Sequence, residues 1–144
     1  MIGVRNVQRR HAFDIAQLQA FAERARRACL RLRRPARTAL AALEEVDILV
    51  ISDRRIAALH RQFMQIAGPT DVLTFQHGEI FISIDTAQAN ARGFQTSLEH
   101  ELQLYLLHGL LHLHGYDDAT PAQAREMHAV QERILCRLAE AAAV

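Results

Sequence analysis

The sequence predicts an α/β protein with a layered α+β architecture, in which a small mixed β-sheet of about four strands packs against about five helices. Short runs rich in β-branched residues alternate with longer segments whose apolar positions recur every three or four residues. Their order is strand, helix, strand, helix, two strands and then helices. The 144 residues, of which 50% are apolar and 23% charged, suit one globular domain over residues 1–144.

The N-terminal third is predicted to contain one strand and one long helix. Residues 2–7 alternate weakly between apolar and polar side chains, which suits an edge strand. Asp14 suits the N-cap of a helix that begins at Ile15 and has a helical apolar period. Pro35 ends this helix, because proline cannot continue the backbone hydrogen bonds. Residues 39–43 then favour a short helical segment.

The central third is predicted to hold three strands and one helix. Residues 46–51 form a short β-branched run, which is typical of a strand buried on both faces. Asp53 suits the N-cap of the helix that follows. Residues 72–75 and 79–84 are two further strands, and residues 77–78 between them predict a tight connection.

The C-terminal third is predicted to be helical. Thr96 and Glu99 form a capping box that opens a long helix. Because this helix is apolar nearly all round, we expect it to be the buried, central helix of the domain. Gly115 ends it. A final helix opens at Thr120, with Gln123 completing a second capping box.

The basic residues of this chain are unusual in kind and in distribution. All 17 are arginine, against 16 acidic residues, and the formal net charge is +1. Seven of them fall within 14 residues, between Arg24 and Arg37. Such a cluster either binds phosphate groups or forms one solvated side of a helix in a chain whose codons favour arginine. Charge alone favours neither interpretation.

Composition also predicts the compartment and the state of the two cysteines. No apolar run approaches the roughly 18 residues of a spanning helix, and the polar start of the chain lacks the pattern of a secretory signal. We therefore expect a cytoplasmic protein that does not bind membranes. Cys29 and Cys136 lie on predicted apolar helix faces, which is the pattern of buried thiols and not of a disulfide.

The most informative segment reads HGLLHLHGYDD and begins at His108. In a helix, His108 and His112 lie one turn apart on one face, so both imidazoles can bind one divalent ion. Gly115 lets the chain turn back, so that Asp118, or its neighbour Asp117, can supply a third ligand. Two histidines on a buried helix can also be hydrogen-bonded core residues. The surrounding leucines and the acids that follow favour a metal site.

Position 109 bears on the class of hydrolase. Zinc peptidases with an H-E-x-x-H helix carry their general-base glutamate there, so Gly109 argues against proteolysis. Activation of water then falls to the metal or to a carboxylate from elsewhere, for which Glu101, Asp71 and Asp117 are candidates. His114 points across the helix from the metal face, and we expect it to pair with backbone or solvent.

At these residues the chain resembles the YbeY family of bacterial metal-dependent endoribonucleases. The family's signature reads close to HGxLHLxGYDH, and HGLLHLHGYDD matches it at every specified position except the last. Upstream, residues 68–75 (GPTDVLTF) are similar to the family's PTDVLSF segment, and residues 78–83 (GEIFIS) to its GDIVIS strand. Downstream, Met127 and residues 131–135 (QERIL) fit its last helix. The resemblance covers most of the chain.

The resemblance implies a single-strand-specific endoribonuclease that acts in ribosomal RNA maturation and ribosome quality control, with a zinc-like ion held by three histidines. Asp118 stands in place of the third histidine. An aspartate oxygen can bind zinc, but its negative charge also admits harder ions. Met64 stands where the family usually carries an arginine important for activity, and Arg61 lies one helical turn earlier. His60 stands where an asparagine is common.

The leading hypothesis is therefore hydrolysis of an RNA phosphodiester by metal-activated water. His108, His112 and Asp118 hold the ion, which we expect to be Zn²⁺ with one ion per chain. Arg61, or an arginine between Arg24 and Arg37, neutralises the phosphate. The alternative is a ribosome-binding assembly factor that keeps the fold and a structural metal with weak or no catalysis. Hydrolysis of a small molecule or a peptide is disfavoured by the missing glutamate.

Overall fold

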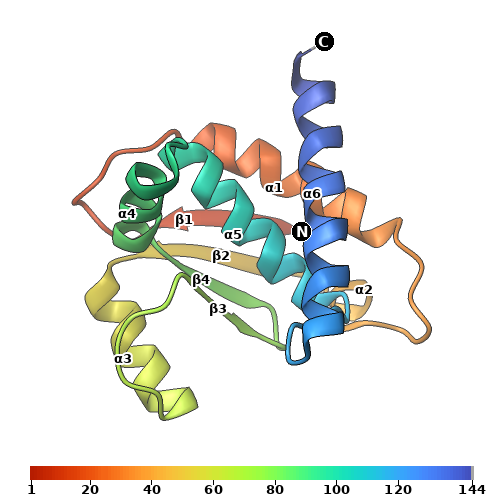
Figure 1. The fold of residues 1–144 in the computed structure, drawn as a ribbon, viewed down its shortest axis with the longest axis horizontal. Coiled ribbons are helices and arrows are strands. Elements are labelled where there is room, and N and C mark those ends of the chain that lie inside the picture. Colours follow the sequence, from red (N-terminus) through yellow and green to blue (C-terminus); the bar gives the residue numbers. More distant parts are fainter. Residues whose placement is uncertain (144) are drawn as a thin grey trace.

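The structure, a computed structural model, describes residues 1–143, and over them it contains four strands and six helices (Figure 1). The strands are β1 (Ile2–Asn6), β2 (Val46–Ile51), β3 (Val72–Phe75) and β4 (Glu79–Ser83). The helices are α1 (Ile15–Leu30), α2 (Ala39–Ala42), α3 (Asp53–Met64), α4 (Ile84–Phe94), α5 (Leu98–Leu113) and α6 (Pro121–Ala143). The predicted α/β class with a small four-stranded sheet is confirmed.

The four strands form one mixed sheet in the order β1-β2-β4-β3. β1, β2 and β4 run parallel, and β3 pairs with β4 in the antiparallel sense. The predicted tight connection joins β3 to β4. There the N–H of Gly78 donates to the carbonyl of Phe75 at 2.9 Å, and Gly78 has a φ of +111°, which residues with a Cβ rarely adopt. Because β3 is last in the strand order and pairs only with β4 within the described residues, it is an edge strand.

The helices cover the two faces of the sheet unequally. α1, α4, α5 and α6 lie over one face and α3 lies over the other (Figure 1). Alternate residues of β2 follow this division, because successive side chains point to opposite faces. Val46, Ile48 and Val50 are fully buried under the larger layer. Asp47 and Leu49, on the α3 side, are only half-buried, so the prediction of burial on both faces holds in part.

α5 runs through the middle of the larger helical layer and contacts α1, α4, α6 and strands β3 and β4. Its leucines are buried on several faces: Leu102, Leu106, Leu107, Leu110 and Leu111. The predicted buried central helix is confirmed. Because it is packed on nearly every side, the side chains at its C-terminal end are held in a fixed frame.

Two helix N-termini differ from the prediction by one residue. The N-cap of α3 is Ser52, whose hydroxyl accepts a backbone N–H bond of 3.3 Å, and not Asp53. The N-cap of α5 is Ser97, with a bond of 3.0 Å, and not Thr96. In both places two adjacent residues have side chains that can cap a helix, so the sequence does not distinguish between them.

Two other helix starts are confirmed and one helix is new. Asp14 caps α1 by accepting the N–H of the residue three positions later. Thr120 and Gln123 form the predicted capping box, in which each backbone N–H donates to the other residue's side chain, at 3.1 and 3.2 Å. α4 is absent from the predicted elements. It begins at Ile84 directly after β4, with Ser83 as N-cap, so the apolar run of the strand continues into the helix without a break.

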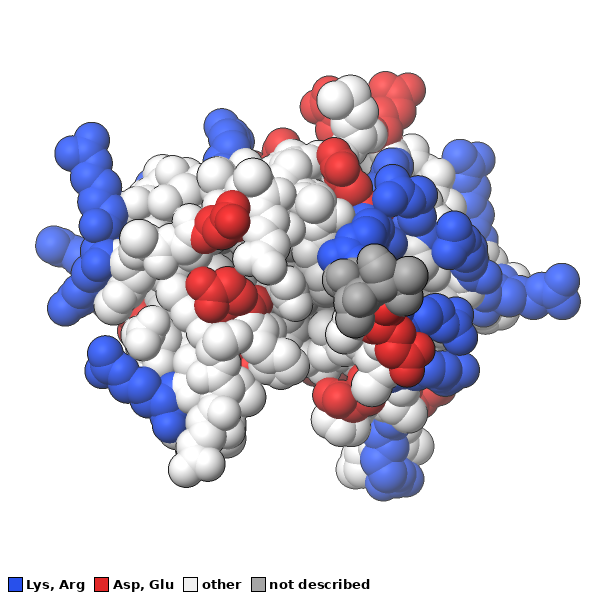
Figure 2. Space-filling model, turned by 90° about the horizontal axis from the view of Figure 1, so that it is seen from above, with Lys and Arg blue, Asp and Glu red and all other residues white. Residues whose placement is uncertain are grey.

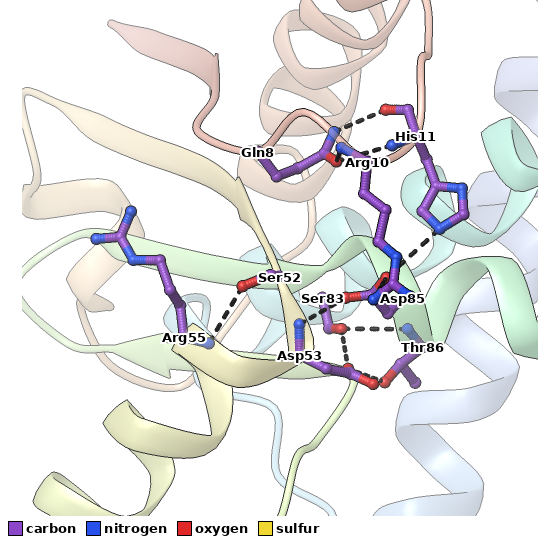
Figure 3. Close-up of polar contacts among 9 residues, drawn as sticks. All are labelled: Gln8, Arg10, His11, Ser52, Asp53, Arg55, Ser83, Asp85 and Thr86. Carbon is purple, nitrogen blue, oxygen red and sulfur yellow. Dashed lines mark hydrogen bonds and ion pairs between the residues drawn. The ribbon is translucent and has the colours of Figure 1, made fainter.

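Asp53, which does not cap α3, instead ties α3 to α4 at the carboxyl ends of the parallel strands (Figure 3). Its carboxylate accepts hydrogen bonds from the hydroxyls of Ser83 and Thr86. Its backbone N–H donates to the carboxylate of Asp85 at 2.8 Å. Asp85 also lies 3.4 Å from Nε2 of His11, which attaches the loop before α1. This network holds both helix starts against β2 and β4.

The two cysteines lie in different environments. Cys29 is buried as predicted, and burial raises the pKa of its thiol to about 12. Cys136 is exposed on α6, so its predicted burial is wrong. Within residues 1–143, none of the helices has the length and apolar character needed to span a membrane.

Candidate metal centre

His108 and His112 lie one turn apart on α5, and their imidazoles converge. Their Nε2 atoms are 3.1 Å apart, and the rings meet edge to face with centroids 4.6 Å apart. The side chains are 27% and 24% exposed, near the C-terminal end of a helix that contacts α1, α4, α6, β3 and β4. The pair is therefore within reach of solvent and small solutes.

The turn after α5 brings Asp118 to the two imidazoles. Gly115 has a φ of +88°, and the N–H of Tyr116 donates back to a carbonyl of α5 at 3.0 Å, so the chain reverses. The carboxylate oxygens of Asp118 lie 3.6 Å from Nε2 of His108 and 3.8 Å from Nε2 of His112. One ligand atom from each of the three residues lies within 4.8 Å of the others.

Asp117, the other acid in this turn, does not join the group. Its carboxylate accepts the backbone N–H of Asp118 at 2.8 Å, and its side chain is exposed. The sequence did not decide whether Asp117 or Asp118 is the third candidate ligand, and the structure brings Asp118 to the histidines.

The hydrogen bonds of the two imidazoles direct their Nε2 lone pairs at each other. Nδ1 of His112 donates to the carbonyl of Tyr116 at 3.1 Å, and Nδ1 of His108 lies 3.1 Å from Oε1 of Gln131. A neutral ring that carries its proton on Nδ1 has a free lone pair on Nε2. Two lone pairs and the carboxylate of Asp118 thus converge, and a proton or a metal cation among them relieves their repulsion. The donor set fits a divalent metal ion with three protein ligands.

The electrostatic environment favours the neutral form of His108. Burial lowers its pKa below the usual 6.5, and the neighbouring His112 lowers it further. The hydrogen bond to Gln131 and the carboxylates of Asp118 and Asp71 act in the opposite direction. Because burial dominates, the imidazole is neutral near pH 7, and the neutral imidazole is the form that binds metals.

The metal group lies between two cavities. One, of about 370 Å³, separates the group from Met64 at the end of α3 and from residues 70–74, which form the end of the preceding loop and most of β3. The other, of about 280 Å³, extends toward α6 and is also lined by His128 and Gln131. A molecule bound at the metal group can therefore continue past it on two sides.

Other residues singled out by the sequence have different places. Arg61 is exposed on α3 and lines neither cavity, so the structure does not bring it to the metal group. Met64 does line the larger cavity. Nδ1 of His60 lies 3.1 Å from the carbonyl of Gly68 and so holds the loop after α3. His114 pairs with a backbone carbonyl at 2.9 Å, as predicted.

Two groups that orient the imidazoles were not predicted in that role. Gln131 carries a signal in the sequence, since it is a polar residue on the buried face of α6, beside Val130 and near Ile134. A buried amide normally has a specific hydrogen-bond partner, here His108. The carbonyl of Tyr116 is part of the backbone and leaves no signal in the sequence.

Gly109 faces the sheet and not the metal group. A Cβ at this position would come within 2.8 Å of Cγ2 of Ile80 and 3.1 Å of Oγ1 of Thr74. A glutamate therefore cannot be accommodated here without moving α5 away from β4. Packing thus gives a second reason, besides the residue type, to exclude a peptidase of the H-E-x-x-H class.

Comparisons with known proteins identify relatives of this chain. A family model described as Endoribonuclease YbeY matches residues 4–139. A curated relative with that description from Anaeromyxobacter sp. strain Fw109-5 is 44% identical over 118 residues, which cover 72% of this chain and 62% of the relative. One from Acholeplasma laidlawii is 35% identical over 100 residues, covering 64% of this chain and 73% of the relative.

A solved structure has the same fold. The solution structure of TM1509 from Thermotoga maritima is 27% identical in sequence, has a TM-score of 0.64, and is matched over 93% of this chain and 86% of that one. By contrast, the match spans only 62% and 60% of the length of the two Anaeromyxobacter relatives.

Proposed function

The chain belongs to the endoribonuclease YbeY family, and we propose that it is a metal-dependent endoribonuclease that cleaves single-stranded ribosomal RNA. The observation that carries the proposal is the convergence of His108, His112 and Asp118 between two cavities. Such a site suits a polymer that extends on both sides of the reacting bond. Its place of action is ribosomal RNA maturation and ribosome quality control in the cytoplasm, with the ribosome as partner.

The proposed ion is Zn²⁺, one per chain, held by Nε2 of His108, Nε2 of His112 and the carboxylate of Asp118. A divalent ion bound there supplies positive charge that polarises a phosphoryl oxygen and lowers the pKa of water toward about 7. A carboxylate among the ligands also suits harder ions such as Mn²⁺.

We assign the role of proton acceptor for the attacking water to Asp71, which lines the same cavity as the metal group. One of its carboxylate oxygens is held by the N–H of Val72 at 2.8 Å and the hydroxyl of Thr70 at 3.3 Å. The second oxygen is left to accept a proton. Glu101 is only 3% exposed and lies outside the lining of both cavities. Asp117 is engaged with the neighbouring backbone N–H.

The arginines between Arg24 and Arg37 divide into two groups. Three donate hydrogen bonds to backbone carbonyls elsewhere in the fold: Arg24, Arg26 and Arg34. The other four are exposed: Arg27, Arg31, Arg33 and Arg37. Figure 2 shows basic side chains gathered at the end of the molecule where α1 ends beside α6. The proposed role of the exposed four is to bind RNA phosphates, and Arg61 remains a second candidate.

A second candidate function is a ribosome-binding assembly factor with weak or no catalysis and a structural metal. Met64 favours it, because this thioether lines the larger cavity at the position where the resemblance calls for an arginine. A thioether has no positive charge to offer a phosphate. The two candidates differ in turnover and not in fold.

Elemental analysis and RNA cleavage by the purified protein test the proposal. We expect about one zinc ion per chain and cleavage of single-stranded but not double-stranded RNA. The bound zinc and the cleavage should both be lost in His112→Ala. His100→Ala, exposed in the first turn of the same helix, is the matched control and should keep both. Metal-free, inactive wild-type protein would refute the proposal. Salt-dependent ribosome binding without cleavage, even with added zinc or manganese, would establish the assembly factor instead.

A further inference from the structure

One arginine of the basic segment, Arg34, is packed against the turn that carries the metal group. Its guanidinium lies over the ring of Tyr116, with Cζ 3.8 Å from the ring centroid. Nη2 donates to the carbonyl of Gly115 at 3.0 Å, and Nη1 lies 3.8 Å from a carboxylate oxygen of Glu126 at the start of α6. The side chain is only 19% exposed, because most of it packs against this turn.

The loop that contains Arg34 is attached to the same turn at a second point. His114, the last residue before Gly115, is buried. Its Nε2 lies 2.9 Å from the carbonyl of Leu32, and its Nδ1 lies 2.8 Å from the hydroxyl of Thr38. Two side chains thus join the loop between α1 and α2 to the turn after α5: Arg34 reaches from the loop to the turn, and His114 reaches from the turn to the loop.

The turn held in this way is the one that orients the metal ligands. The carbonyl of Tyr116 accepts the Nδ1 proton of His112 at 3.1 Å, and Asp118 follows two residues later. A shift of the turn would rotate the His112 ring and move the Asp118 carboxylate together. Arg34 touches neither ligand directly, so any effect on them passes through the backbone of residues 115–116.

The cost of burying Arg34 suggests a role beyond stability. Its Nε is buried and has no hydrogen-bond partner within the part of the chain that the structure describes. A largely buried guanidinium with an unmet donor costs free energy, and an apolar side chain of similar length could cover Tyr116 without that cost. What an apolar side chain cannot supply is the N–H donor that holds the Gly115 carbonyl.

We propose that Arg34 is a positioning residue for the metal group, which holds the turn at Gly115 and Tyr116 so that His112 and Asp118 keep their relative placement. The proposal rests on the metal binding proposed above. It assigns to one arginine of the basic segment a role in the geometry of the site, separate from any contact with RNA.

Metal affinity and cobalt spectra of the full chain test this, with no need for an activity assay. Zinc affinity is measured by competition with a chromophoric chelator, and Co²⁺ is used as the spectroscopic probe. We expect Arg34→Met to keep the unfolding temperature of the metal-free protein but to weaken zinc binding by about tenfold and to change the Co²⁺ d–d absorption bands. Arg34→Lys should also weaken binding, because an ammonium group lacks the planar shape that lets the guanidinium stack on Tyr116 and donate to the Gly115 carbonyl at the same time.

Arg125 is exposed near the start of α6, and Arg125→Met is the control that should bind zinc like the wild type. If Arg34→Met and Arg34→Lys both bind zinc with wild-type affinity and give the wild-type Co²⁺ spectrum, the positioning role is refuted while the metal site stands. If Arg34→Met fails to fold, Arg34→Lys alone decides between these outcomes. If the wild type itself binds no metal, the function proposed above has failed, and this inference with it.

Discussion

Gly109 on α5 lies so close to Ile80 on β4 that a Cβ added to the glycine would come within 2.8 Å of Cγ2 and 2.9 Å of Cδ1 of the isoleucine. This contact sets the distance between the helix that carries His108 and His112 and the sheet beneath it. Ile80 is fully buried and its Cγ2 is attached directly to Cβ, so it cannot move aside at low cost.

We therefore expect Gly109→Ala to destabilise the protein. Overpacking of a core costs about 1 to 3 kcal/mol, which exceeds the gain of about 1 kcal/mol from placing alanine in a helix. The free energy of unfolding in urea should fall by about 1 to 2 kcal/mol. Gly93→Ala in α4 is the control, because a Cβ there meets nothing within 4 Å, and it should stabilise the protein. A stabilised Gly109→Ala variant would contradict this account of the helix–sheet contact.

Asp71→Asn should separate proton transfer from metal binding. The asparagine keeps the oxygen that accepts the N–H of Val72 but cannot accept a proton from water. We expect RNA cleavage to slow by about 10² to 10⁴-fold and zinc content to stay unchanged. Asp117→Asn is the matched control and should cleave normally. Wild-type turnover by Asp71→Asn would show that another group takes the proton.

Asp118→His should change which ion the site prefers. A third imidazole replaces a charged oxygen ligand by a softer nitrogen, so the ratio of zinc affinity to manganese affinity should rise by about tenfold, or about 1.4 kcal/mol. Isothermal titration of the metal-free protein with each ion gives this ratio. Asp117→His, on the residue that does not join the group, should leave it unchanged. Equal ratios in all three proteins would mean that Asp118 does not bind the ion.

The exposed arginines should contribute to RNA binding through charge. Arg33→Gln and Arg37→Gln should each weaken binding of single-stranded RNA and reduce the slope of log affinity against log salt concentration by about 0.7. Fluorescence anisotropy over a range of salt concentrations measures both quantities. Arg92→Gln, exposed on α4, is the control for a loss of charge elsewhere. If Arg92→Gln weakens RNA binding as much as Arg33→Gln and Arg37→Gln do, the basic segment is not the RNA-binding surface.

The two thiols should differ in reactivity and in pH dependence. At pH 8 a thiol reagent should label Cys136 in the native protein but not Cys29, whose pKa burial raises from 9.0 to about 12. Because the native state keeps this proton above pH 9 while the unfolded chain loses it, the thiol's contribution to stability is present below pH 9 and is lost as pH rises above it. Native Cys136→Ser should not be labelled. Labelling of both thiols in the folded wild type would contradict the burial of Cys29.

Much of the site could be predicted from local patterns in the sequence. His108 and His112 face the same way because four residues make about one turn of any α-helix, whatever surrounds it. Gly115 ends that helix, and Thr120 and Gln123 open the next, through hydrogen bonds between residues only a few positions apart. Such features depend on neighbours in the chain, so sequence reasoning reaches them.

Only the tertiary structure decided which residues from distant parts of the chain meet at the candidate site. Only packing shows that Asp118 and not Asp117 meets the histidines, that Asp71 shares their cavity, and that Arg61 does not. The basic segment is the clearest case. Its sequence contains seven arginines that look equivalent, but Arg34 packs over Tyr116, 82 positions later, and is only partly exposed, while Arg33 beside it is exposed. Adjacent identical residues acquire different roles because contacts between distant segments depend on how the layers pack, and composition does not encode that.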